Sequence, residues 1–146
     1  NCRGATPLDI AITGPRGGEI SKDLQVQAYM AVKDFAKYLG INRLKTNIEV
    51  KLHHKWLVEG DAEALCEAVD ERTFIIDVGL YCNWISNLAH EMVHVKQFAR
   101  GELDPNMTRW KSNRYVGDIE YWDQPWEKEA RKLQHKMAEL FTKGQL

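Results

Sequence analysis

The stretch from Asn83 to Gly101, NWISNLAHEMVHVKQFARG, constrains the fold of this chain more than any other. Its apolar side chains recur every three or four residues, which is the spacing of one face of an α-helix. They are Leu88, Met92, Val95 and Phe98. Asn83 is a suitable N-cap, and Gly101 stands where such a helix should end. The pattern predicts a long helix with an apolar face directed at a core.

The same helix carries three polar side chains among apolar neighbours. His90 and His94 are four residues apart, so their rings project side by side, and Glu91 is rotated away by about 100°. Two imidazoles placed in this way can bind one zinc ion, while the carboxylate stays within reach of a water molecule beside it. An ordinary helix with packed or solvated histidines is the alternative, but polar groups among apolar side chains need partners. We expect His90 and His94 to be metal ligands and Glu91 to be a catalytic general base.

A catalytic zinc site takes three protein ligands, so the third must come from elsewhere in the chain. Pro125 marks the start of a second predicted helix, which runs to about Phe141. Glu127 and Glu129 lie near its start, and His135 lies about 12 Å further along. We prefer a glutamate, because a loop can bring a helix start against a neighbouring helix. Spacing does not choose between the two, and at least one of them can be an acid that only interacts with the helix dipole.

The remaining patterns predict a small sheet and one more helix. Helical spacing covers residues 21–39, and a long loop with a small hairpin is expected at 102–125. Strand patterns cover residues 7–13, 46–57 and 72–80, while 61–69 fits either a strand or a short helix. His53 and His54 fall on opposite faces of a strand and cannot share a metal. We expect one α+β domain spanning residues 1–146.

Composition and short motifs disfavour several classes of protein. Twenty basic residues nearly balance twenty-one acidic ones, which disfavours nucleic-acid binding, and the glycine-rich turn at 14–19 lacks the lysine of a phosphate loop. The three cysteines are too scattered for a disulfide framework, which favours a reducing compartment. Without a membrane span or a signal peptide, a soluble and cytoplasmic protein is expected. The oligomeric state stays open.

The pieces HEMVH at 90–94 and PWEKEA at 125–130 resemble the gluzincin group of zinc metallopeptidases. Over roughly residues 20–142 the layout is similar to the minimal members, such as the ImmA/IrrE-like, SprT-like and phage-type proteins. The resemblance implies a zincin-like fold, in which a small mixed sheet packs against the HExxH helix and flanking helices. It also implies a Zn²⁺ cofactor, a peptide or protein substrate, and Glu127, three residues before Ala130, as the third ligand.

The resemblance also carries expectations about the surroundings of the metal. Where many gluzincins have an acid that orients a zinc histidine, this chain has Arg131, so Asp77, Asp123 or a backbone carbonyl is expected instead. The FIIDV strand at 74–78 is expected to be either an edge strand that pairs with substrate, as in such enzymes, or a plain structural strand.

Loop aromatics could line the cleft, where a tyrosine could stabilise an oxyanion, but such side chains more often pack than catalyse, so none is assigned a catalytic role. They are Tyr115, Tyr121 and Trp122.

Two other functions fit the same residues. One is a non-catalytic zincin-like binding or regulatory domain with structural zinc, and the other is a metal-dependent hydrolase of a non-peptide substrate. Glu91 disfavours the first of these, because a structural zinc site has no use for a base.

Overall fold

The structure is a computed structural model that describes residues 8–14, 20–54, 63–114 and 119–146. Most of the glycine-rich turn and Tyr115 lie outside the described residues. Four strands form the main sheet: β1 (Leu8–Thr13), β2 (Thr46–His53), β3 (Ala64–Asp70) and β4 (Thr73–Gly79). Three helices accompany them: α1 (Lys22–Tyr38), α2 (Trp84–Ala99) and α3 (Pro125–Thr142). The predicted α+β class with a small mixed sheet is confirmed.

The strand order is β1-β2-β4-β3. β1, β2 and β4 run parallel, whereas β3 pairs antiparallel with β4 at one edge. The ambiguous segment at 61–69 therefore contributes a strand. The expectation that the FIIDV strand lies at an edge is wrong, because β4 is hydrogen-bonded on both sides and β3 takes the edge position. Alternation could not reveal this, since strand order depends on pairings between distant segments.

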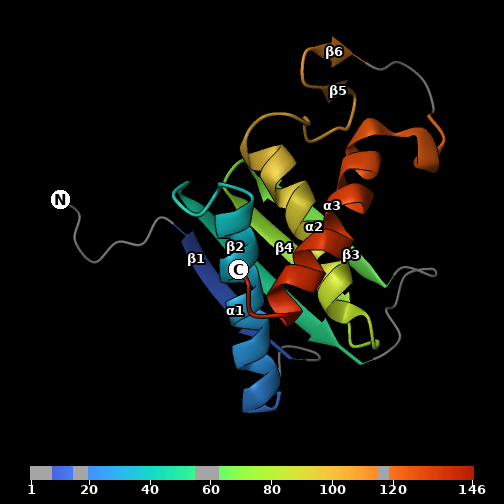
Figure 1. The fold of residues 1–146 in the computed structure, drawn as a ribbon. Coiled ribbons are helices and arrows are strands. Elements are labelled where there is room, and N and C mark those ends of the chain that lie inside the picture. Colours follow the sequence, from blue (N-terminus) through green and yellow to red (C-terminus); the bar gives the residue numbers. More distant parts are fainter. Residues whose placement is uncertain (1–7, 15–19, 55–62, 115–118) are drawn as a thin grey trace.

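One face of the sheet is covered by helices (Figure 1). α1 contacts β1, α2 contacts β3 and β4, and α3 packs mainly on α2. The alternating pattern of β2 explains this arrangement, because Ile48, Val50 and Leu52 are buried while their neighbours are more exposed. On the opposite face His53 bonds Asp77, with 2.8 Å between Nε2 and Oδ1.

The helix ends follow the sequence in most places. Ser21 Oγ accepts a hydrogen bond from the backbone N–H of Leu24 at the start of α1. Gly101 has a φ of +70° just beyond α2, the left-handed conformation that glycine adopts at helix ends. Asn83 precedes α2 as predicted, but its side chain makes no capping hydrogen bond. Its ψ of 24° departs from the extended backbone that lets an N-cap side chain turn back onto the helix.

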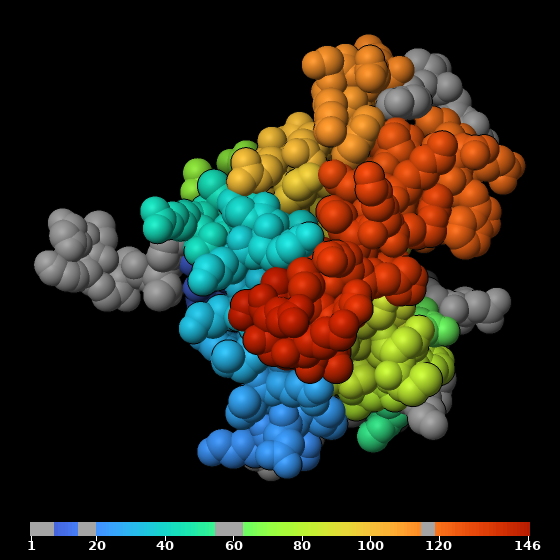
Figure 2. All heavy atoms as spheres, in the orientation of Figure 1, coloured from blue at the N-terminus to red at the C-terminus, as the bar shows by residue number. Residues whose placement is uncertain are grey.

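Residues 102–114 form a projection above α2 and α3 (Figure 2). The projection contains the predicted hairpin, made of β5 (Arg109–Trp110) and β6 (Asn113–Arg114). Its base is a second small core, in which Leu103 and Trp110 pack with Trp126 at the start of α3. A short 3₁₀ helix, η2 (Tyr121–Asp123), then leads into α3. No described helix has the length and apolar character needed to span a bilayer.

Candidate metal centre

Three side chains that lie far apart in the sequence converge between α2 and α3. The ligand atoms of His90, His94 and Glu127 all lie within 4.8 Å of one another. Glu127 Oε1 is 2.9 Å from His90 Nε2, and its Oε2 is 3.2 Å from His94 Nε2. The two imidazole rings are 5.0 Å apart and inclined at 73°. Within the described ranges this is the cluster of histidine and acidic side chains whose geometry suits a metal ion.

The other two ligand candidates point elsewhere. Glu129 bonds Lys96 Nζ at 3.0 Å and Gln97 Nε2 at 2.9 Å. His135 Nδ1 lies 3.5 Å from Ser86 Oγ, at the other side of the cluster. Of the two glutamates that spacing could not separate, the structure therefore brings Glu127 to the histidines.

The orientation of α3 explains why Glu127 reaches α2. Pro125 occupies the first turn of the helix, where its missing N–H costs nothing. Trp126 beside it is only 2% exposed and packs into the second small core. This anchor fixes the rotation of the first turn, so that the next side chain is directed at the histidine pair.

Glu91 and the three side chains of the cluster are all buried. The exposed fractions of His90, Glu91, His94 and Glu127 lie between 6% and 9%. Burial raises the pKa of the Glu91 carboxyl, and the neighbouring histidines only partly offset this effect. A carboxylate with a raised pKa is a better proton acceptor near neutral pH. A bound cation would act in the opposite direction, since its charge stabilises the ionised form.

The Glu127 carboxylate and the His94 ring shift each other's pKa. Burial would raise the pKa of Glu127, but the hydrogen bonds from both histidines outweigh it and lower the pKa. Burial would lower the pKa of His94, but its bond to Glu127 outweighs that effect and raises the pKa. The carboxylate is therefore ionised at neutral pH, as a metal ligand must be.

Two glutamines hold the outer ring nitrogens of the histidines. His90 Nδ1 lies 2.6 Å from Gln134 Oε1, and His94 Nδ1 lies 2.8 Å from Gln97 Oε1. The expectation that Asp77 or Asp123 fills this role is wrong, because Asp77 is paired with His53 on the far face of the sheet and Asp123 is exposed. In both contacts a neutral amide oxygen takes the place of a carboxylate.

Arg131, one turn after Glu127 on α3, contacts Trp122. Its Nη2 donates to the backbone carbonyl of Trp122 at 2.8 Å, and its guanidinium lies 4.6 Å from the indole ring. These contacts hold η2 against α3. Tyr121 thereby lies beside Glu127, where burial and the carboxylate raise the pKa of its hydroxyl to about 12.

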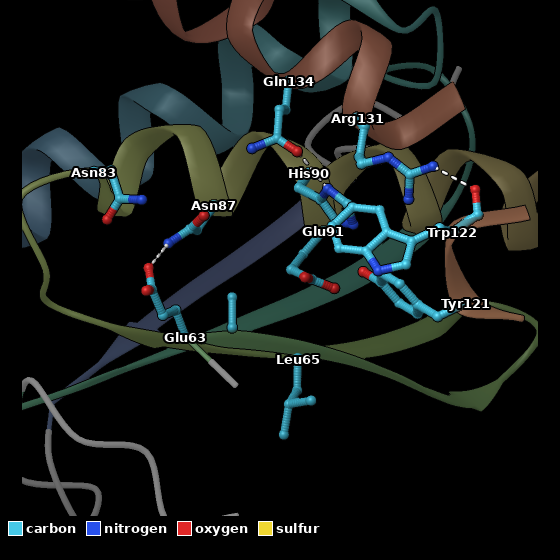
Figure 3. A pocket seen from close by; sticks show the side chains of 11 residues that line it. Glu63, Leu65, Asn83, Asn87, His90, Glu91, Tyr121, Trp122, Arg131 and Gln134 are labelled. Atoms are coloured by element: carbon cyan, nitrogen blue, oxygen red, sulfur yellow. Dashed lines mark hydrogen bonds between the residues drawn. The ribbon is translucent and has the colours of Figure 1, made fainter. Parts of the chain in front are cut away.

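A cavity of about 630 Å³ opens in front of the cluster. His90 and Glu91 lie at its centre, with Tyr121 and Trp122 at one end and Glu63 bonded to Asn87 at the other (Figure 3). A smaller cavity of about 180 Å³ shares His90, Glu91 and Tyr121 and adds apolar side chains such as Phe98 and Met107. Residues 64 and 65 of edge strand β3 line both cavities.

Sequence reasoning missed three components of this site: Gln97, Gln134 and the edge strand β3. Gln97 had a usable signal, since it follows His94 by three residues and shares its face of the helix. Gln134 and β3 had none, because their contacts cross between elements.

The three side chains offer a donor set that could hold a metal ion. Two neutral imidazoles and one carboxylate are a ligand set that leaves the fourth position open. Both imidazoles present Nε2 to the carboxylate while Nδ1 is held from behind. Such outer contacts orient histidines that bind metals.

Comparison of the chain with family models, with curated proteins and with solved structures gives no significant match. What the centre does must therefore be inferred from its geometry.

Proposed function

We propose that this domain is a zinc-dependent metallopeptidase, with His90, His94 and Glu127 as ligands and Glu91 as general base. The observation that carries the proposal is the convergence of two Nε2 atoms on one carboxylate, next to a second, buried carboxylate that lines an open cavity. A purely structural site would need neither the second carboxylate nor the cavity.

The residues of the chain divide the work of peptide hydrolysis. A bound zinc ion would supply the Lewis acid that acidifies water and polarises a carbonyl group. Glu91 accepts a proton from the attacking water while the oxygen of that water forms a bond to the carbonyl carbon of the substrate. When the C–N bond breaks, Glu91 passes that proton to the leaving amine. A tyrosine hydroxyl with a pKa of about 12 keeps its proton, so Tyr121 can donate a hydrogen bond to the developing oxyanion.

The position of β3 favours an extended peptide as substrate. β3 is an edge strand, and its first residues line both cavities beside Glu91. An unpaired strand edge can hydrogen-bond an added strand, which is a common mode of peptide recognition. A peptide bound along β3 would pass the site with its backbone held at regular intervals.

The test combines metal content with turnover. We expect the purified chain to bind zinc and to hydrolyse casein or unstructured peptides in a reaction that a chelator abolishes. Glu91→Gln should keep the zinc and lose roughly 10²- to 10⁴-fold in kcat, the usual contribution of a general base. Glu139→Gln, an exposed change of the same kind on α3, is the matched control and should behave like wild type.

Two results would overturn the proposal in different ways. Absence of zinc from the purified protein, even after zinc is supplied, would reject the metal centre. Bound zinc without peptide turnover would reject the peptidase and point to a non-catalytic domain or to another substrate.

A further inference from the structure

Gln97 is the least exposed polar side chain of the metal centre, with 0% of its surface accessible. Its carboxamide makes three contacts. Nε2 donates to the Trp126 carbonyl and to Glu129 Oε1, both at 2.9 Å, and Oε1 faces His94 Nδ1 at 2.8 Å. A buried amide with all of these contacts is held in one position.

The chemistry of its neighbours fixes which way this amide points. A backbone carbonyl and an ionised carboxylate can only accept hydrogen bonds, so both require the NH₂ group. Rotating the amide by half a turn would place its oxygen against two acceptors and leave them unpaired in a buried site. The oxygen of Gln97 must therefore face His94.

This orientation determines the tautomer of the ring. Because the amide oxygen only accepts, His94 Nδ1 must carry a proton and donate it. The nitrogen left for a metal is then Nε2, which in the metal-free site donates to the Glu127 carboxylate. A zinc ion would bind Nε2 in place of that proton, so the amide prepares the ring for metal binding.

Gln134 does not impose the same choice on His90. Its Nε2 contacts Ser86 Oγ at 3.1 Å, and a hydroxyl group can either donate or accept. Both orientations of the Gln134 amide can therefore be satisfied. The two histidines resemble each other in position but differ in how firmly their tautomers are set.

Glu129 is fixed in turn by Lys96. Lys96 Nζ bonds Glu129 Oε2 at 3.0 Å and Glu102 Oε1 at 2.8 Å. A continuous chain of contacts thus runs from Lys96 through Glu129 and Gln97 to His94.

We propose that Gln97, oriented by Glu129 and the Trp126 carbonyl, is the positioning residue that commits His94 Nε2 to the metal. This role rests on the proposed metal centre and deepens it. Glu129, one of the two candidate ligands, takes part as the anchor of Gln97.

The test measures zinc affinity of the full chain by competition with a chromophoric chelator. Gln97→Met keeps the length of the side chain and removes its hydrogen bonds, and it should weaken zinc binding roughly 10- to 100-fold. Gln25→Met, the same change at an exposed position of α1, is the matched control and should leave affinity unchanged. Gln134→Met should cause a smaller loss than Gln97→Met.

A second measurement separates positioning from a general effect on folding. In the zinc-loaded wild type, proton NMR should show a slowly exchanging Nδ1–H of His94, and this signal should disappear in Gln97→Met. If Gln97→Met does not fold, Glu129→Met carries the test, and it should weaken zinc binding relative to Glu139→Met at an exposed site.

The possible failures can be told apart. If the wild type binds no zinc, the proposed function itself is rejected. If the wild type and Gln97→Met bind zinc equally well, or if Gln134→Met has the larger effect, the metal centre stands and the role of Gln97 is overturned.

Discussion

The two sides of α2 face different surroundings. Towards the sheet, Leu88, Met92 and Val95 belong to a continuous apolar core with no exposed surface. Towards α3, His90 and His94 meet a carboxylate and two amides at hydrogen-bond distances. Packing on the first side is non-directional and tolerates side chains of similar size. The side with His90 and His94 depends on the direction of each hydrogen-bond donor and acceptor. Substitutions there should therefore abolish function before they unfold the protein.

Phe35→Ala should have the largest effect on stability and little effect on the metal centre. Phe35 is fully buried on α1, with its ring 5.6 Å from that of Phe141. Removing it should lower the free energy of unfolding by about 3–5 kcal/mol, from lost burial and a cavity. Urea unfolding measures this value. The folded variant should bind zinc as tightly as wild type, and weaker binding would show that the two sides of α2 are coupled.

His94→Ala should remove the stabilisation by zinc, the property that Phe35→Ala should keep. Zinc at a thousandfold excess over its Kd should stabilise the wild type by about 4 kcal/mol, because it binds only the folded state. The variant lacks a ligand and should gain almost nothing. Thermal unfolding with and without zinc measures the difference, and Phe35→Ala is the control that should retain the full gain. A zinc-dependent gain in His94→Ala would place the ion elsewhere.

Glu91→Gln should make the metal-free protein more stable near neutral pH. Burial raises the pKa of Glu91 in the folded protein, so the fold loses stability as the pH rises from the unfolded pKa of this group to its folded pKa. Below the unfolded value of about 4.3 the group is protonated in both states, and this cost disappears. The difference in unfolding free energy between variant and wild type should therefore shrink as the pH falls from about 7 to about 4. Urea unfolding in the presence of chelator tests this, and a difference that grows on acidification would contradict it.

Asp77→Asn should have the smallest effect. The carboxylate bonds His53 on the open face of the sheet, where both side chains are partly exposed. A pair of this kind contributes about 0–1 kcal/mol. Zinc affinity should be unchanged, and a tenfold loss would restore Asp77 as a partner of the metal centre.

The sequence predicted local structure better than it predicted contacts between elements. Helical spacing located α1 and α2, and Pro125 marked the start of α3. Alternation or β-branched and aromatic content located β1, β2 and β4, because each of these signals lies within one element. The edge position of β3 was missed, since its sequence fits a helix or a strand and its neighbour is fixed only by pairing. The partners of the histidines were missed for a similar reason, because an acid or a backbone carbonyl was expected there and the structure supplies side-chain amides from Gln134 and Gln97.

The sequence by itself determined that His90, His94 and Glu91 share one helix. A spacing of four residues places the two imidazoles on the same face once that helix forms. Helix spacing left Glu127 and Glu129 equivalent, and only the resemblance of the PWEKEA segment implied Glu127. The tertiary structure supplies the physical reason for the difference, because the rotation of α3 depends on Trp126 packing against the hairpin projection. That rotation turns one glutamate to the histidines and the other to Gln97 and Lys96. Side chains two residues apart on a helix point about 160° away from each other, so a packing contact outside the cluster decides which of them can reach it.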